Sequence, residues 1–343
     1  MRVVVFGATG NVGSALVRRL SDNATVTEVV GVARRTPVAA PAKVRWQRAD
    51  VRHSDLRPLV AGADAVVNLA WLIQPQRDRA LLEAVNVAGG RRVLDAVLES
   101  GVPRLICASS VGAYAAGPKD HPVDESWPAT GIPTSQYARH KAALEHLLDT
   151  VADGRDDLAV VRMRTALVFQ RSAASEIARL FLGRFAPIRS IGRRRVPLVP
   201  GHDRLVFQCV HADDAAAAYE AALEPSARGA YNVAAGDVLD SGDLADVFGG
   251  RGVPVPAPLL RGVAAAGFHL RLLPIEPGWL DLAMGVPTMD CSRIRDELGW
   301  RPQRSAVQAL GDLLDGFAAG AGHRQPPLDR NAGRPVPLSS TLP

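Results

Sequence analysis

The chain has 343 residues, of which 47% are hydrophobic and 22% charged, and this length and balance suit one large or two coupled globular domains. Lysine and arginine exceed aspartate and glutamate by five, and because no basic block gathers this surplus, the composition does not indicate nucleic-acid binding. Cys107, Cys209 and Cys291 are odd in number and far apart, which fits neither a disulfide framework nor a zinc site, so we expect reduced thiols and no metal.

The start of the chain predicts a strand, a glycine loop and a helix. Val3 to Phe6 lack the alternation of a half-exposed strand, which indicates a strand buried on both faces, as in parallel sheets covered by helices. Gly7, Gly10 and Gly13 follow, and a helical pattern begins directly after them. Glycines at this place let backbone N–H groups and the positive end of a helix approach an anion. We expect a pyrophosphate site here, although the spacing is not Gly-x-Gly-x-x-Gly and a plain packing loop is the alternative.

The second predicted strand, residues 26–33, ends where a dinucleotide-binding fold expects a carboxylate for the ribose hydroxyls. Arg34 and Arg35 stand there instead. Two guanidinium groups suit a 2′-phosphate, so NADP is the favoured cofactor, with NAD as the alternative. A solvated arginine loop is the other interpretation of this pair.

The next elements continue the alternation of strand and helix. Strands are predicted at 44–47, 65–70 and 104–109, and a helix at 79–100 that ends at Gly101. Asp50, which follows the first of these strands, either faces an adenine ring or caps a turn. Leu69 and Ala70 end the second, where a cofactor ring could lie close. The order predicts an α/β fold with a doubly wound parallel sheet of the Rossmann type, in which ligands bind at the carboxyl ends of the strands.

A Pro-rich loop over 117–133 leads to a predicted helix over 134–151, on which Tyr137 and Lys141 are four residues apart and share a face. Lowering the pKa of a tyrosine from about 10 to about 7 requires about 4 kcal/mol, and a lysine cation about 6 Å away supplies about 3. Such a tyrosine can exchange a proton with a carbonyl or alcohol oxygen while hydride moves to or from a nicotinamide. A hydroxyl at the preceding strand end, Ser109 or Ser110, would steady that oxygen. Alone, Tyr-x-x-x-Lys is usually a solvated helix face.

Together these motifs resemble those of the extended short-chain dehydrogenase/reductases, the superfamily of NAD-dependent epimerases and dehydratases. Residues 7–13 (Gly-Ala-Thr-Gly-Asn-Val-Gly) resemble the cofactor loop of that family, residues 108–114 (Ala-Ser-Ser-Val-Gly-Ala-Tyr) its serine segment, and residues 133–141 (Pro-Thr-Ser-Gln-Tyr-Ala-Arg-His-Lys) its catalytic helix. The resemblance runs to about residue 320.

The resemblance implies a role for each of these residues. Tyr137 is the general acid/base, and Lys141 lowers its pKa and holds the nicotinamide ribose. Ser110 polarises the substrate oxygen, with Ser109 as the second choice. Asn86 lies where relatives carry an asparagine of a proton relay, and a helix-packing amide is the equal alternative. The predicted cofactor-binding residues are Gly7, Thr9, Gly10, Asn11, Val12, Gly13, Arg34, Arg35, Asp50, Val51, Leu69, Ala70, Tyr137 and Lys141.

The resemblance also implies a division of the chain. We expect a dinucleotide-binding domain over 1–170 and 208–235, and a smaller, mostly helical substrate-binding lobe over 171–207 and 236–320. Residues 321–343 are rich in proline and polar residues without apolar periodicity, which predicts a loose tail. His211, Asp213 and Asp214 are expected to be structural. Residues 177–182 and 258–274 are apolar enough to line a pocket, and core packing explains them equally well.

Departures from the family patterns narrow the predicted chemistry. Val111 and Gly112 replace the Asp-Glu pair of sugar-nucleotide dehydratases, and Leu167 and Phe207 replace an asparagine and an arginine usual in sugar-nucleotide epimerases. The prediction is therefore an NADP-dependent oxidoreductase that acts on a carbonyl or secondary alcohol of a mainly apolar small molecule. The alternatives are an NAD-dependent nucleotide-sugar epimerase and a cofactor-sensing protein without catalysis.

The predicted surroundings are those of a cytosolic enzyme. The first residues already form a strand without a charged leader, and no apolar run is long enough to span a bilayer. We expect a small-molecule substrate, no nucleic acid and no membrane, with a homodimer as one option.

Overall fold

The chain folds around β1 (Arg2–Phe6), whose four apolar residues are fully buried. Val3 and Val5 pack against one helical layer, and Val4 and Phe6 pack against the other. The sequence predicted a strand buried on both faces, because apolar and polar residues do not alternate in it, and the structure confirms this. The structure is a computed structural model that describes residues 1–74, 77–183, 186–323 and 327–329.

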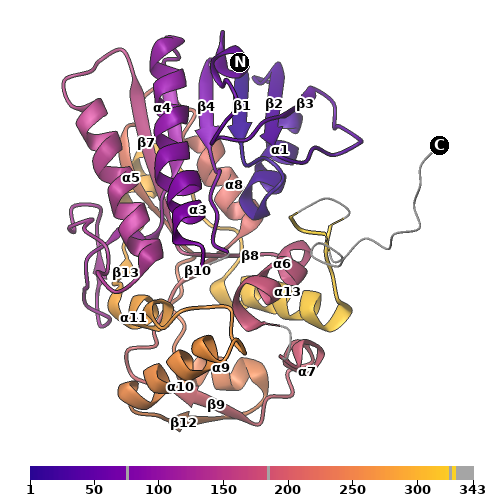
Figure 1. The fold of residues 1–343 in the computed structure, drawn as a ribbon, viewed down its shortest axis with the longest axis vertical. Coiled ribbons are helices and arrows are strands. Elements are labelled where there is room, and N and C mark those ends of the chain that lie inside the picture. Colours follow the sequence, from indigo (N-terminus) through magenta and orange to yellow (C-terminus); the bar gives the residue numbers. More distant parts are fainter. Residues whose placement is uncertain (75–76, 184–185, 324–326, 330–343) are drawn as a thin grey trace.

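Seven parallel strands form the central sheet, in the order β11-β7-β5-β4-β1-β2-β3 (Figure 1). Besides β1 they are β2 (Glu28–Ala33), β3 (Val44–Arg48), β4 (Ala65–Asn68), β5 (Arg104–Ala108), β7 (Ala159–Thr165) and β11 (Gly229–Val233). The strand order runs outward from β1 to β3, then crosses to β4 and continues in the opposite direction. This confirms the doubly wound α/β sheet, with its switch point between β1 and β4, where such sheets bind ligands.

Helices cover both faces of the sheet. On one face α1 (Asn11–Asp22) packs beside α8 (Ala212–Ala221). The other face carries α4 (Gly89–Glu99), α5 (Gln136–Ala152) and the short α2 (Arg57–Val60). The helix predicted over 79–100 is interrupted, because α3 (Arg79–Glu83) and α4 are joined by the π-helical turn η1 (Ala84–Ala88).

A smaller, mostly helical lobe lies at the carboxyl edge of the sheet (Figure 1). Its helical segments are α6 (Ala174–Ile177), η4 (Ala178–Leu182), α7 (Ile188–Gly192), α9 (Ser241–Phe248), α10 (Ala257–His269), α11 (Gly278–Gly285) and α13 (Ala306–Ala319). Three short parallel pairs are β8 (Leu167–Phe169) with β10 (Cys209–His211), β9 (Leu198–Gly201) with β12 (Arg251–Pro254), and β6 (Pro122–Val123) with β13 (Thr288–Met289). The remaining elements are the single turns η2 (Val111–Ala113) and η3 (Arg171–Ala173) and the helix α12 (Ser292–Leu298).

The predicted boundaries of the lobe and tail differ from the structure in two places. Ile294 of α12 and the following Trp300 lie inside the predicted lobe, yet their large apolar side chains fill the core between α1, α8 and the sheet. In the predicted tail, residues 321–323 and 327–329 pack on the lobe, where the Arg179 guanidinium donates to the Pro327 and Asp329 carbonyls at 2.6 and 3.0 Å and Leu328 is 1% exposed. The other residues of that predicted tail lie outside the described residues.

The polar residues at the start of α8 have structural partners, as expected. His211 accepts a hydrogen bond from the Asp213 N–H at 3.1 Å and so caps the helix. The Asp214 carboxylate accepts from the backbone N–H groups of Gln303 and Arg304. Throughout the described part of the chain, no helix has both the length and the apolar character needed to cross a bilayer.

Candidate active site

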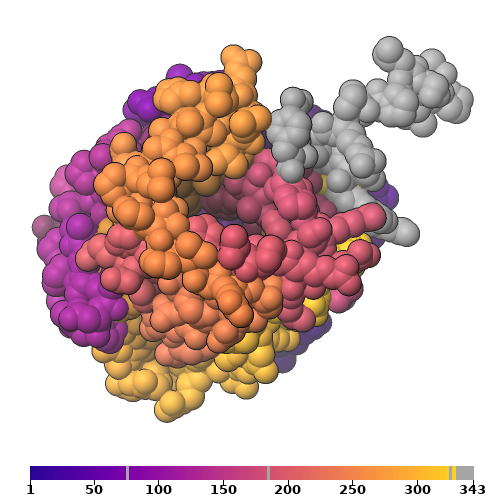
Figure 2. Space-filling model, turned by 90° about the horizontal axis from the view of Figure 1, so that it is seen from below, coloured from indigo at the N-terminus to yellow at the C-terminus, as the bar shows by residue number. Residues whose placement is uncertain are grey.

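A cavity of about 750 Å³ lies between the carboxyl edge of the sheet and the lobe. Figure 2 shows a hollow from below, between segments of the lobe. Its walls run from the glycine loop to the apolar side chains of Ile177, Leu180, Phe181 and Leu182. Residues 177–182 thus contribute to the pocket, whereas residues 258–274 do not line it. The volume is in the range of sites that enclose an organic ligand.

The glycine loop is shaped to accept a phosphate group. Gly7 has a φ of +74°, and a Cβ there would lie 2.7 Å from the carbonyl carbon of Leu69. A Cβ at Gly13 would lie 2.2 Å from the Gly7 oxygen, so the turn requires glycine at both positions. Gly10 precedes α1 without a side-chain cap, which leaves the first N–H groups of the helix to face an anion. The loop therefore fits the diphosphate of a dinucleotide.

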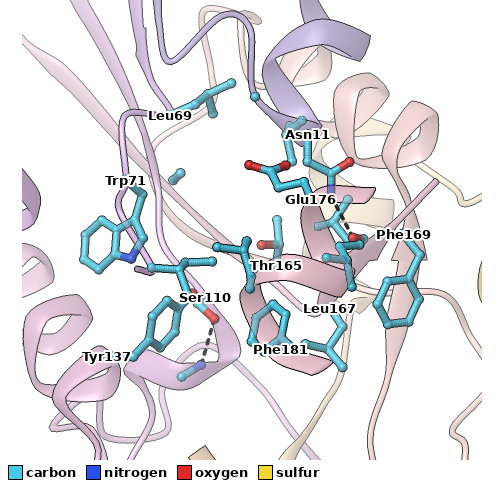
Figure 3. Close-up of a pocket in the computed structure, with 18 of the residues that line it drawn as sticks. Asn11, Leu69, Trp71, Ser110, Tyr137, Thr165, Leu167, Phe169, Glu176 and Phe181 are labelled. Carbon is cyan, nitrogen blue, oxygen red and sulfur yellow. Dashed lines mark hydrogen bonds between the residues drawn. The ribbon is translucent and has the colours of Figure 1, made fainter. Parts of the chain in front are cut away.

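Asn11 ties this loop to the lobe side of the cavity. Its amide donates to the Val168 carbonyl at 2.8 Å and accepts from Gln170 Nε2 at 2.8 Å (Figure 3). Thr9, Gly10, Asn11, Val12 and Gly13 all line the cavity. The predicted loop residues are therefore together, although the Asn11 side chain holds β8 in place.

The residues predicted for the adenosine part of the cofactor line the same cavity. They are Arg34, Arg35, Asp50, Val51, Leu69 and Ala70. The Asp50 carboxylate is held by the Arg52 guanidinium at 3.0 and 2.8 Å, and this pair lowers the pKa of Asp50 to about 2. Asp50 also accepts the Arg52 N–H at 3.0 Å, so it caps a turn as well as lining the cavity. Arg34 and Arg35 are exposed at this end.

Three residues of the predicted catalytic set meet on one wall. Tyr137 lies in the first turn of α5, which begins with the Ser135 cap. Lys141, one turn later, is 3% exposed, and its Nζ lies 5.8 Å from the centre of the Tyr137 ring. Ser110 accepts the Gly112 N–H at 3.0 Å and faces Tyr137 (Figure 3). Gly112 makes this approach possible, because a Cβ there would lie 2.8 Å from Tyr137 Cε1.

Burial sets the protonation states of this group. It raises the pKa of Tyr137 to about 12, and the nearby Ser110 hydroxyl lowers this pKa only in part. Burial also lowers the pKa of Lys141 to about 7, although electrostatic interactions with Cys107 and Glu145 raise this pKa in part. Desolvation therefore dominates the pKa of Tyr137, and the lowering of this pKa by Lys141 stays a prediction for the cofactor-bound protein.

The two adjacent serines have different partners. The Ser109 hydroxyl donates to the buried Glu145, whose carboxylate is held by the Arg164 guanidinium at 2.9 and 3.1 Å. This network lies under α5, one turn beyond Lys141. Ser109 is thus engaged away from Tyr137, which favours Ser110 as the hydroxyl that meets the substrate.

Asn86 is held away from the tyrosine hydroxyl. Its amide donates to the Leu72 carbonyl at 2.8 Å and accepts the Leu72 N–H at 2.7 Å. Both sides of the amide are therefore occupied by the segment that follows β4. This arrangement favours the packing role, and the proton relay stays a prediction that these contacts do not support.

Sequence reasoning missed an aromatic wall around Tyr137. The Trp71 ring lies edge-on to the Tyr137 ring, with 5.8 Å between the ring centres (Figure 3), and the Lys141 Nζ lies 3.5 Å from the centre of the Trp71 ring. The centre of the Trp279 ring lies 4.9 Å from that of Tyr137. Phe181 extends the wall, 5.1 Å from Trp279. Trp71 could have been found, because it directly follows a strand at the ligand-binding edge. Trp279 comes from a distant helix and carries no local signal.

Comparison with known proteins places this geometry in a family. The family model of the NAD dependent epimerase/dehydratase family matches residues 3–234. The uncharacterized protein Rv2047c of Mycobacterium tuberculosis (strain ATCC 25618 / H37Rv) is 28% identical over 91% of this chain and 30% of its own length. This chain therefore spans less than a third of that relative.

Two further proteins are similar over nearly their whole length. The dTDP-6-deoxy-L-talose 4-dehydrogenase (NAD(P)(+)) of Kitasatospora kifunensis is 29% identical over 91% of this chain and 94% of its own. A UDP-glucose-4-epimerase from Stenotrophomonas maltophila, solved with bound NAD and formylated UDP-arabinopyranose, matches with a TM-score of 0.71 and 21% identity over 93% of this chain and 98% of that one. At this identity the second match supports the fold alone.

Proposed function

Because the chain belongs to the NAD-dependent epimerase/dehydratase family, we propose that it is a nicotinamide-dependent oxidoreductase acting on a carbonyl group or secondary alcohol. One observation carries the proposal: Ser110, Tyr137 and Lys141 meet on one wall of a cavity whose far end is the glycine loop. When bound, the nicotinamide supplies or accepts the hydride at the substrate carbon. The residues of this chain hold the substrate oxygen and move its proton.

The protonation states suit proton donation to a carbonyl oxygen. With its pKa raised to about 12 by burial, Tyr137 keeps its proton at neutral pH and can donate it. Ser110, which faces Tyr137 in Figure 3, would place a second hydroxyl at the same oxygen. A charged Lys141 would stabilise the resulting phenolate, and its ammonium would hold ribose hydroxyls of the cofactor.

The lining of the cavity favours a mainly apolar substrate. Leu167 and Phe207, which replace polar residues usual in sugar-nucleotide epimerases, both line it. They face the same space as Phe181 and Trp279. Few polar side chains are thus available to read the hydroxyl groups of a sugar on the lobe side.

Two guanidinium groups at the adenosine end support NADP as the cofactor. Arg34 and Arg35 are exposed and line the cavity, so both could donate to a 2′-phosphate. NAD is the alternative, and it is the cofactor bound to the epimerase from Stenotrophomonas maltophila. The dehydrogenase of Kitasatospora kifunensis is named for both.

A nucleotide-sugar epimerase is the second candidate, and the comparisons favour it over the first. The matching family model is that of epimerases and dehydratases, and the relative from Kitasatospora kifunensis, 29% identical, is named as a dehydrogenase of a dTDP-sugar. An epimerase would use the same tyrosine and serine but return the hydride to the substrate, so the cofactor would not be consumed.

A screen with both reduced and both oxidised cofactors tests the two candidates. Carbonyls, secondary alcohols and nucleotide sugars are added in turn, the nicotinamide absorbance is followed, and the products are resolved by chromatography. Net cofactor turnover with a carbonyl or alcohol supports the oxidoreductase, whereas conversion of a nucleotide sugar without net turnover supports the epimerase. Tyr137→Phe is the control and should abolish either signal. Failure to bind any nicotinamide dinucleotide would overturn both candidates.

A further inference from the structure

One carboxyl group in the cavity has no partner among the residues that the structure describes. Glu176 of α6 lines the same space as the glycine loop. Figure 3 shows it beside Asn11, the first residue of α1, with its carboxyl group directed into the cavity. Within residues 1–74, 77–183, 186–323 and 327–329, no hydrogen bond or ion pair engages this group. The other acidic side chain in the lining, Asp50, is paired with Arg52.

The surroundings of Glu176 make its ionisation costly. Burial raises the pKa of Glu176 to about 7, and the attraction of Arg179 lowers it in part. Arg179 acts only from a distance, because its guanidinium donates to two backbone carbonyls of the segment 327–329. The other charged side chains in the lining of the cavity are Arg34, Arg35, Asp50 and Lys141, and none of them is a cause of this shift.

An ionised Glu176 would conflict with the ligand of the glycine loop. A carboxylate within about 5 Å of one phosphate charge, at an effective dielectric of 20, weakens binding more than about a hundredfold. A neutral carboxylic acid has no such repulsion and carries one O–H donor. Because burial has already made ionisation costly, protonation of Glu176 requires little additional free energy at neutral pH.

We propose that Glu176 is a cofactor-binding residue that takes up a proton when the dinucleotide binds, so that its neutral carboxyl group donates a hydrogen bond to a diphosphate oxygen. The proposal rests on the proposed function, since it needs a diphosphate at the glycine loop. The proton comes from solvent and returns to it on release. Dinucleotide affinity should therefore be constant below about pH 6 and fall about tenfold per pH unit once Glu176 is ionised.

ADP-ribose is the probe, because it keeps the diphosphate and both riboses but cannot take part in hydride transfer. Its dissociation constant is measured by calorimetry between pH 5.5 and 8.5 for the wild type, Glu176→Gln and Asp315→Asn. The wild type and Glu176→Gln should bind equally at pH 5.5, and the glutamine variant should bind about tenfold or more tighter at pH 8.5. Lys141 also titrates near pH 7, but both proteins contain it, so its effect cancels in the ratio. Asp315→Asn, outside the cavity, should follow the wild type.

A second measurement counts the protons taken up. At pH 8, binding in two buffers of different ionisation enthalpy should show uptake of close to one proton more in the wild type than in Glu176→Gln, because any uptake by Lys141 occurs in both proteins. Equal proton uptake in the two proteins, or an affinity ratio between wild type and Glu176→Gln that does not change with pH, would overturn the role of Glu176. ADP-ribose that fails to bind at any pH would instead overturn the cofactor site on which the proposed function rests.

Discussion

Replacing Ser109 or Ser110 by alanine should separate stability from catalysis at a single strand end. Ser109 donates to Glu145, which is 1% exposed, so Ser109→Ala removes a hydrogen bond from a buried charged group. Hydrogen bonds to charged groups contribute about 1.5 to 3 kcal/mol, and the Arg164 guanidinium still holds Glu145 afterwards. We expect the free energy of unfolding to fall by about 1.5 to 3 kcal/mol and turnover to change little.

Ser110→Ala should do the opposite. Among the residues that the structure describes, its oxygen accepts only the Gly112 N–H, at 3.0 Å, and it lies beside Tyr137, so little stability depends on it. In the reaction it would donate to an oxygen that gains charge, and loss of one such donor lowers turnover by roughly 10- to 100-fold.

Urea-induced unfolding and initial rates with any substrate found in the screen measure the two effects. A stable but inactive Ser109→Ala together with an active Ser110→Ala would refute the assignment and move the catalytic hydroxyl by one residue. If both variants lost stability equally, the separation between the two partners would itself be wrong. The double variant should show both losses, because the two serines contact different side chains.

Three further replacements test other parts of the site. Tyr137→Phe should keep ADP-ribose affinity and remove most turnover, because only the proton-transferring oxygen is lost; near wild-type rates would contradict its role. Arg34→Ala should weaken the binding of NADPH by roughly 10- to 100-fold and the binding of NADH far less, measured by fluorescence titration at low salt. Equal losses of affinity for the two cofactors would mean that Arg34 and Arg35 form a solvated loop without a role in cofactor choice. Gly112→Ala should displace the Tyr137 ring, because the new Cβ would lie 2.8 Å from Tyr137 Cε1, and so lower turnover with little unfolding. Gly236→Ala is the control, because a Cβ there would have no atom within 4 Å. Unchanged rates in Gly112→Ala would disprove the close approach.

The fold was predictable because its signals are local. The uninterrupted apolar run in β1 and the glycines after it define a buried strand and a phosphate-binding turn without reference to any other part of the chain. The family match over residues 3–234 confirms the resemblance that these motifs indicated. The π-helical turn at Ala84–Ala88 was not predictable in this way, because the apolar stripe of the helix continues through it and only the contacts of Asn86 with Leu72 mark it.

The site was predictable only in part. Tyr137 and Lys141 are one turn apart, so the sequence alone places them on one face, and the strand end places Ser110 near them. The pKa of Tyr137 depends on how many side chains surround it, and those include Trp71 and Trp279, which come from segments far away in the chain. Desolvation by such distant residues has no signature in the sequence, so the rise of the Tyr137 pKa on burial could not be predicted from it.

Glu176 should also make the stability of the ligand-free protein depend on pH. Its pKa is raised from 4.5 to about 7 in the folded protein, so between these values the folded state holds a proton that the unfolded state has released. The stability linked to this proton is fully present below about pH 4.5 and is lost as the pH rises through 7, by up to about 3 kcal/mol. Lys141, whose pKa is lowered to about 7, shifts stability in the opposite direction between pH 7 and 10.5, but it does so in both the wild type and Glu176→Gln. The difference in unfolding free energy between these two proteins, measured in urea from pH 4.5 to 8.5, should therefore grow with pH in favour of the glutamine variant. A constant difference would mean that water reaches the Glu176 carboxylate and stabilises its charge.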